Sequence, residues 1–206
     1  MGKGTIILLG ILAAMIAVAA FIGIAWVSAY NGMVGKDEAR KQSWAQVQNQ
    51  YQRRYDLIPN LEAAVKGHAK HEEAVFVKIS EARSGISSVM KGVTAEQMQA
   101  DPELQKKFLA AQAQLSSALV NFKSVQEAYP QITADKSFLK FEDELSGTEN
   151  RIAVARRDFT NAVQSYNVTV RGFFSGIVAR SNGFDVKPTF EADEGAAKAP
   201  KVSFEK

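Results

Sequence analysis

The feature that most constrains the fold is an uncharged, apolar segment near the N-terminus, from Thr5 to Ala29. Its 25 residues exceed the roughly 20 helical residues needed to cross hydrocarbon about 30 Å thick. We therefore interpret it as a permanent transmembrane helix. The alternative is a cleaved signal peptide, because Val27, Ser28 and Ala29 form an acceptable small-residue cleavage site. Against that alternative, the apolar region of a signal peptide usually has only about 7–15 residues.

The charges that flank this segment predict its orientation. Only Lys3 precedes it, whereas Lys36, Arg40 and Lys41 follow it closely. Cytoplasmic loops carry an excess of lysine and arginine. We therefore expect the C-terminal domain to be cytoplasmic.

The rest of the chain shows a helical period, because apolar residues recur at alternating steps of three and four. Two clear series are Leu104, Phe108, Ala111, Leu115, Ala118, Phe122 and Phe138, Phe141, Leu145, Thr148, Ile152, Ala155, Phe159. The pattern predicts helices over about 31–55, 57–86, 102–128 and 136–180. One kinked, continuous helix is the alternative for the first two. We expect an all-α fold, in which an N-terminal transmembrane helix precedes an antiparallel up-and-down bundle of about four long helices.

Capping and turn residues mark the ends of these helices. Asp101 is a good N-cap before a proline at the first helical position, and Asn182-Gly183 is a C-terminal stop. The last helix is long for this bundle, so we expect either a break at Gly147 or Gly172 or an end that extends beyond the bundle. The chain then divides into a flank (1–4), the span (5–29), the bundle (30–184) and an extended or flexible tail (185–206). For the tail, folding back on the bundle as an extended strip, docking onto a partner and disorder are all open.

Composition argues against several classes of function. The net charge is only +3, which does not suggest the basic face of a nucleic-acid-binding protein. The chain has no cysteine for a thiolate metal site, and no glycine-rich loop follows a strand. The carboxylates Glu142, Asp143 and Glu144 are consecutive on a helix and therefore point in different directions. We expect neither an enzyme nor a bound cofactor.

Both histidines lie in the segment HAKHE, residues 68–72. Their spacing does not match the zinc motifs HExxH and HxxEH, so no metal site is expected. His68 and Glu72 are four residues apart on one helical face, and both fall on the apolar stripe. We interpret them as a buried polar pair, with a pH-sensitive contact or a metal half-site as alternatives.

The segment YQRRYDLIPNL, residues 51–61, has two compatible interpretations. As architecture, it forms the distal turn of the bundle, with Asp56 as the cap of the second helix. As a functional surface, it forms a partner-docking tip together with the YPQI turn, which the up-and-down path brings to the same end. The residues of this docking tip are Arg53, Arg54, Tyr55, Asp56, Pro59, Tyr129 and Pro130.

At the opposite end, residues 170–180 are amphipathic and rich in aromatic side chains. The returning last helix brings them close to the bilayer. Phe173, Phe174 and Ile177 would then enter the membrane interface, with Arg171 and Arg180 at the lipid headgroups. The alternative is that these residues complete the core of the bundle.

Short motifs in order over nearly the whole chain resemble the LemA family. They are Tyr30-Asn31, Trp44, RRYDLIPNL, Lys66-Gly67, His71-Glu72, AYPQI, GTENRIAVARR, Tyr166-Asn167, Gly183-Phe184 and APKVSF. The resemblance implies a bacterial protein with one N-terminal transmembrane helix, an antiparallel bundle of long helices and no assigned enzymatic activity.

The chain departs from the family at His68, which is commonly tyrosine, and near Phe159-Thr160, where a Tyr-Asn pair is usual. It also has Phe173-Phe174 where the family usually has Phe-Pro, so the family's proline break in the last helix is missing.

These observations favour a membrane-anchored, non-enzymatic helical scaffold or adaptor of the bacterial inner membrane. It would act through contacts with other membrane or envelope proteins, or with copies of itself, as well as with the lipid bilayer. The alternative is a membrane-tethered sensor that uses a polar site around His68 and Glu72.

Overall fold

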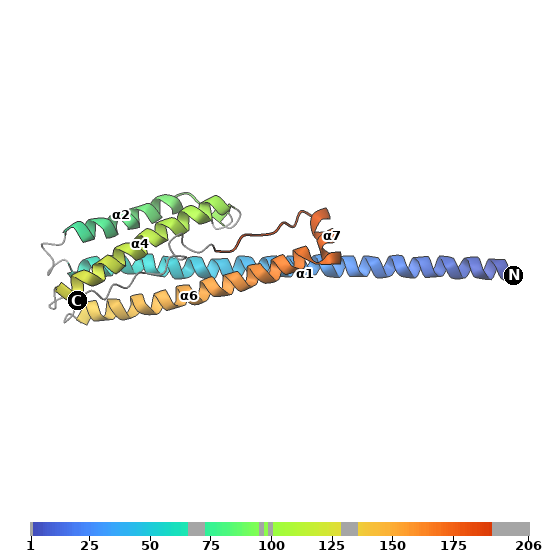
Figure 1. Cartoon of the computed structure of the whole chain (residues 1–206), viewed down its shortest axis with the longest axis horizontal. Helices are drawn as coiled ribbons and strands as arrows, with labels where there is room; N and C mark the ends of the chain where they lie inside the picture. The colour runs from blue at the N-terminus through green and yellow to red at the C-terminus, as the bar shows by residue number, and fades with distance from the viewer. Residues whose placement is uncertain (1, 66–72, 95–96, 99–100, 129–135, 191–206) are drawn as a thin grey trace, which may run out of the picture.

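The computed structural model describes residues 2–65, 73–94, 97–98, 101–128 and 136–190. In this part of the chain it contains five helices and no strand, which confirms the predicted all-α fold. The helices are α1 (Lys3–Val65), α2 (Glu73–Met90), α4 (Pro102–Ala128), α6 (Lys136–Arg171) and α7 (Phe173–Ser181). Figure 1 shows an elongated molecule in which the N-terminal part of α1 projects alone, beyond all the other helices.

The longest element, α1, is a single helix of 63 residues and is therefore about 95 Å long at 1.5 Å per residue. It contains both the apolar segment and the first helix of the bundle. The predicted helix end near residue 55 is wrong, because α1 runs on to Val65. The continuous-helix alternative is not correct either, because α1 and α2 are separate helices.

Local interactions explain why α1 continues through the predicted boundary. The Asp56 carboxylate does not cap a new helix, but accepts a hydrogen bond of 2.7 Å from Gln52 one turn earlier. The apolar face also continues without interruption through Leu57, Ile58 and Leu61, all of them buried. Pro59 removes only the backbone hydrogen bond to the carbonyl of Tyr55. Continued burial on one face thus holds the last turns of α1 in place.

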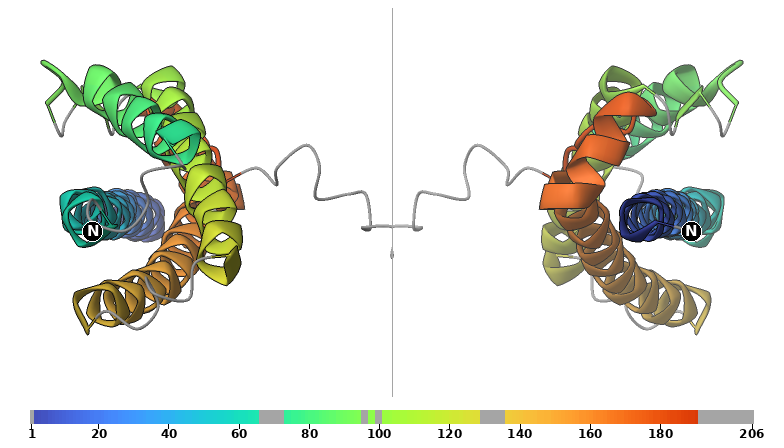
Figure 2. Two further views of the ribbon diagram at one scale, coloured as in Figure 1. Left: turned by 90° about the vertical axis from the view of Figure 1, so that its left-hand side faces the viewer. Right: turned by 90° about the vertical axis from the view of Figure 1, so that its right-hand side faces the viewer.

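The helices form two antiparallel pairs, α1 with α6 and α2 with α4 (Figures 1 and 2). The second pair lies over the half of the bundle that is far from the N-terminus. The side chains between the pairs form one large core, which includes Trp44, Tyr51, Leu61, Phe108, Leu115, Phe122, Phe138, Ile152 and Phe159. This up-and-down arrangement is the predicted one.

Most of the predicted helix ends are also confirmed. α4 begins at Pro102, and the Asp101 carboxylate accepts the backbone N–H of Glu103 at 2.9 Å. The break in the last predicted helix falls at Gly172, one of the two glycines proposed for it, and separates α6 from α7. The stop at Gly183 has a left-handed φ of 74°, which glycine adopts without strain. The second predicted helix runs partly outside the described residues, and α2 ends at Met90 rather than at residue 86.

Candidate functional site

One candidate site lies at the end of the bundle from which the apolar segment emerges (Figure 1). There α7 packs against α1 and α6 around the buried residues Met33, Tyr166, Val170, Val178 and Ala179, which we call the membrane-proximal cluster. Trp26, inside the apolar segment, meets Phe174 edge-to-face with ring centroids 6.5 Å apart. Tyr30 meets Phe184 in the same way at 5.7 Å. The cluster thus joins the end of the apolar segment to α7.

The residues predicted to contact the membrane all lie at the surface of this cluster. Phe173 is 95% exposed, Ile177 45% and Phe174 37%. Arg171 and Arg180 are exposed as well. The inner face of α7 is formed instead by Gly176, Val178 and Ala179.

The break between α6 and α7 is held by short hydrogen bonds. The Ser175 hydroxyl donates to the carbonyl of Thr169 at 2.6 Å, and the N–H of Gly176 donates to the carbonyl of Gly172 at 2.6 Å. A Cβ atom at Gly172 would lie 2.3 Å from the Ser175 hydroxyl oxygen. A side chain at this corner would therefore displace the Ser175 hydroxyl from its hydrogen bond.

The predicted docking tip divides into two parts in the structure. Arg53 and Asp56 are exposed, and Tyr55 and Pro59 are half-buried. Arg54 is only 1% exposed and points into the bundle, so its guanidinium is not at the surface as a docking residue would be. Tyr129 and Pro130 lie outside the described residues.

Arg54 connects three helices. Its guanidinium donates to the hydroxyl of Ser116 at 2.7 Å and to the backbone carbonyl and side-chain amide oxygen of Gln112, and it forms an ion pair with Glu149 at 3.0 Å. It also lies over the ring of Tyr51, with Cζ 5.1 Å from the centroid. The Glu149 side chain remains 44% exposed, so this is a buried cation with a half-solvated partner. Such an arrangement fixes the relative position of α1, α4 and α6.

Sequence reasoning missed this network, although a signal was present. Steps of three and four from Trp44 lead through Tyr51 to Arg54 and then to Ile58, which places an arginine on the apolar stripe. An arginine at such a position has to be paired. The partners Gln112, Ser116 and Glu149 are distant in sequence and give no local sign of their role.

The buried polar pair predicted at His68 and Glu72 lies outside the described residues. Thr148 on α6 is fully buried, and its hydroxyl donates to the carbonyl of Glu144 one turn earlier at 2.7 Å. Within the described ranges no group of three or more His, Asp or Glu side chains is placed to hold a metal ion.

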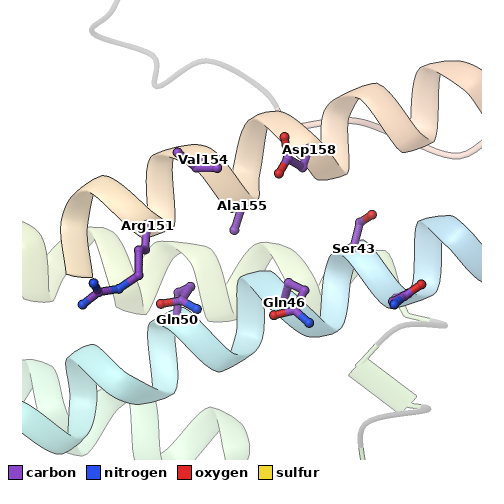
Figure 3. Close-up of a pocket in the computed structure, with 8 residues that line it drawn as sticks. Ser43, Gln46, Gln50, Arg151, Val154, Ala155 and Asp158 are labelled. Carbon is purple, nitrogen blue, oxygen red and sulfur yellow. The ribbon is translucent and has the colours of Figure 1, made fainter. Parts of the chain in front are cut away.

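A polar groove runs between α1 and α6 (Figure 3). It has a volume of about 360 Å³, and α2 and α4 lie behind it in this view. α1 contributes Gln42, Ser43, Gln46 and Gln50, and α6 contributes Arg151, Val154, Ala155 and Asp158. The side-chain oxygen of Gln50 is buried without a hydrogen-bond partner in the described structure. The groove therefore offers amides, a hydroxyl, a guanidinium and a carboxylate to a partner.

The first part of the tail is ordered and lies on the bundle. The side-chain amide of Asn167 pairs with the backbone of Lys187 in both directions, at 2.8 and 2.9 Å, and the Tyr166 hydroxyl donates to the carbonyl of Asp185 at 3.0 Å. The ring of Phe190 then packs against Trp44 and Phe159 at centroid distances of 6.0 and 5.1 Å. Residues 185–190 thus form an extended strip on α1 and α6, while the segment around Val202 and Phe204 lies outside the described residues.

A second charged cluster lies on α1, beyond the apolar segment. The Asp37 carboxylate accepts the Arg40 guanidinium at 3.0 Å and the Lys41 ammonium at 3.1 Å. Burial raises the pKa of the Asp37 carboxyl, but the bonds and charges of Lys41 and Arg40 outweigh burial and hold this pKa below its ordinary value. The cluster thus compensates the charge of the buried Arg40.

Comparison with known proteins places these features in a family context. The sequence model of the LemA family matches residues 43–204. The magnetosome proteins MamQ 1 and MamQ 2 of Paramagnetospirillum magneticum are each 25% identical over 98% of this chain and 78% of their own length. The magnetosome protein MamQ of Magnetospirillum gryphiswaldense is 25% identical over 89% of this chain and 72% of its own length. Neither the family description nor these names states an enzymatic activity.

Proposed function

Since the chain belongs to the LemA family, we propose that it is a membrane-anchored, non-enzymatic helical scaffold or adaptor of the bacterial cell envelope. It acts through contacts with other membrane or envelope proteins, or through self-association. Its place is the inner membrane, with the bundle on the cytoplasmic side, as the lysines and arginines after the apolar segment favour.

The observation that carries the proposal is the continuity of α1. One segment of this helix is long and apolar enough to cross a membrane. No other described part of the chain covers this segment. The same helix continues as the core helix of the bundle, which buries Trp44, Val47 and Ile58. Because no linker separates the two parts, the bundle is held at a fixed distance from the bilayer. This property suits a protein that positions partners.

The membrane-proximal cluster supports an anchor that is retained rather than cleaved. Trp26 and Ala29 both pack against this cluster, so cleavage after Ala29 would remove two side chains that cover it. The N-terminal segment is thus part of the folded structure at its bundle end.

The surfaces open to a partner are the polar groove and the exposed part of the docking tip. The groove presents Gln42 and Gln46, and the tip presents Arg53 and Asp56. Arg54 is buried and does not contact a partner directly, but its bonds to α4 and α6 stabilise the helices that carry the tip. The sensor alternative depends on His68 and Glu72, and no contact of the described residues supports it.

Site-directed crosslinking in native membranes tests the scaffold role. The natural chain has no cysteine, so single-cysteine variants at Gln46, Arg53 and the exposed Val120 report separately on the groove, the tip and the outer face of α4. We expect one of the first two positions to crosslink to a defined protein or to a second copy, with Val120→Cys as the matched control. If no position crosslinks, and a small molecule raises the melting temperature of a monomer, the scaffold role is wrong and the sensor is favoured.

The same variants test orientation. In intact cells, a membrane-impermeant maleimide should label Val120→Cys only after the inner membrane is opened. Labelling before lysis would place the bundle on the outer side of that membrane.

A further inference from the structure

The outer face of α7 is apolar and uncovered by any described part of the chain. Phe173 and Ile177 are one helical turn apart on this face, and Arg180 follows one turn later. The same short helix buries Val178 and Ala179 on its other side. Phe173, Phe174 and Ile177, 95%, 37% and 45% exposed, together form an apolar patch on this short helix, and contact with an apolar phase would remove that patch from water.

The position of α7 along α1 identifies that apolar phase. Trp26, which contacts Phe174, lies three residues before the end of the apolar segment, or about 5 Å inside it. The first charged residue after the segment is Lys36, about 10 Å beyond Ala29. The headgroup region on each side of a bilayer is about 5–7 Å thick. When α1 spans the membrane, α7 therefore lies at the boundary between headgroups and acyl chains.

We propose that α7 is a lipid-binding foot of this protein. Phe173 and Ile177 insert into the bilayer that α1 crosses, and Arg171 and Arg180 bind lipid phosphate groups at its surface. The foot depends on the membrane anchoring in the proposed function, but not on the scaffold role. Two attachments, the span and the foot, then fix the rotation of the bundle about the axis of α1.

The foot can transmit this constraint because its attachment is rigid. The Ser175–Thr169 bond holds its first turn, and the N–H of Phe184 donates to the carbonyl of Ala179 at 3.0 Å after its last turn. Gly176 allows close packing, since a Cβ there would lie 3.2 Å from the carbonyl oxygen of Val170. The apolar side chains are thus presented on a fixed platform, rather than on a flexible loop.

The proposal is tested on the full-length chain in single-chain nanodiscs of phosphatidylethanolamine and phosphatidylglycerol (3:1). An environment-sensitive fluorophore is attached at Phe173→Cys and Ile177→Cys, and lipids carrying spin labels at known depths act as quenchers. Leu12→Cys, inside the apolar segment, is the membrane reference. Val120→Cys, an exposed apolar position on α4, is the matched control. We expect positions 173 and 177 to be quenched at a shallower depth than position 12, and position 120 to be unquenched.

Each other outcome overturns the proposal in a distinguishable way. If position 12 is quenched but 173 and 177 behave like 120, the foot is wrong and the anchor stands. If position 12 is also unquenched, the anchor fails as well. If position 173 is quenched with one chain in each disc but not with two, a second copy covers the face, and it is an interface between copies rather than a lipid site.

The arginines give a second, independent readout. Arg180→Gln should lower the equilibrium ratio of chains with α7 inserted in the bilayer to chains with α7 outside it about fivefold in phosphatidylglycerol-containing discs. Quenching at position 173 measures this ratio. Arg53→Gln, at the far end of α1, is the control and should leave the ratio unchanged. Equal effects of the two substitutions would contradict a phosphate contact at α7.

Discussion

At the scale of single residues, Arg54 shows how a polar side chain can specify a helical bundle. It occupies a position on the apolar stripe of α1 but is bonded to groups on α4 and α6. Buried ionic groups often add little net stability and instead favour one arrangement of helices over others. Here the fork of the guanidinium reaches a hydroxyl, a carbonyl and a carboxylate that meet only in the observed register.

We predict that Arg54→Ala lowers the free energy of unfolding by about 2 kcal/mol, because Gln112 and Ser116 lose a buried partner. The neighbouring Arg53 is exposed, and Arg53→Ala should change it by less than about 0.5 kcal/mol. Denaturant unfolding of both variants in detergent measures the difference. Equal losses for the two arginines would show that the buried network does not contribute to stability.

The Asp37 cluster predicts a specific pH dependence. Because its folded-state pKa is lowered, the carboxylate stabilises the fold above its unfolded pKa of about 4, and this contribution is lost as pH falls through the folded-state value. Asp37→Asn should therefore flatten the acid-side loss of stability, while changing stability near pH 7 by less than about 1 kcal/mol. Unfolding of both proteins from pH 7 to pH 3 measures this. A steeper acid-side loss in the variant would reverse the sign of our argument.

At the scale of elements, the corner between α6 and α7 depends on the absence of a side chain at Gly172. A Cβ there would displace the Ser175 hydroxyl from its bond to Thr169. We predict that Gly172→Ala costs about 1 kcal/mol in the natural background, the worth of one hydrogen bond, and much less in a Ser175→Ala background. A double-mutant cycle by thermal unfolding measures the coupling. Additive effects would mean that the clash is relieved in another way.

The extended strip after α7 gives a second prediction at this scale. Asn167→Ala removes both hydrogen bonds to the backbone of Lys187. Since a hydrogen bond is worth about 1 kcal/mol, protection of the Lys187 amide against hydrogen exchange should fall about tenfold or more. The exposed Asn161, on the same helix, provides the control variant Asn161→Ala. Unchanged exchange in Asn167→Ala would show that Phe190 alone holds the strip.

The sequence predicted the features that depend on residues close together in the chain. It did not predict those that depend on contacts between residues far apart in the chain. The helical stripes, the Asp101 cap and the Gly183 stop are local features, and each was predicted. The end of α1 was misplaced because Asp56 and Pro59 are locally typical of a boundary, whereas buried Leu57, Ile58 and Leu61 hold the helix together through distant contacts. The partners of Arg54, and the pairing of Asn167 with the strip, also depend on tertiary packing that a single sequence does not display.

At the scale of the whole molecule, one helix sets the dimensions. From Tyr30 to Val65, α1 extends about 50 Å beyond the apolar segment. The α2–α4 pair lies over the far half of this extension (Figure 1). When α1 spans a membrane as proposed, the end of the bundle that carries Arg53 and Asp56 is therefore well separated from the lipid, and α7 is close to it.

This geometry predicts the height of the distal end. A donor fluorophore at Asn60→Cys should lie about 45 Å from the end of the apolar segment, and transfer weakly to acceptors in the lipid headgroups. A donor at Val34→Cys, on the same helix, should lie within about 10 Å and transfer strongly. Energy transfer in nanodiscs measures both. Strong transfer from both positions would mean that the bundle lies flat on the membrane.

The unbroken α1 has a mechanical consequence. A transmembrane helix tilts to match its apolar length to the thickness of the bilayer, by about 20° on average. With an arm of about 50 Å, such a tilt moves the far tip sideways by roughly 17 Å. A chain anchored in this way acts as a lever whose pivot is in the membrane, and the proposed lipid contact of α7 would limit its tilt. Changes in membrane thickness of a few ångströms would appear at the tip as much larger displacements.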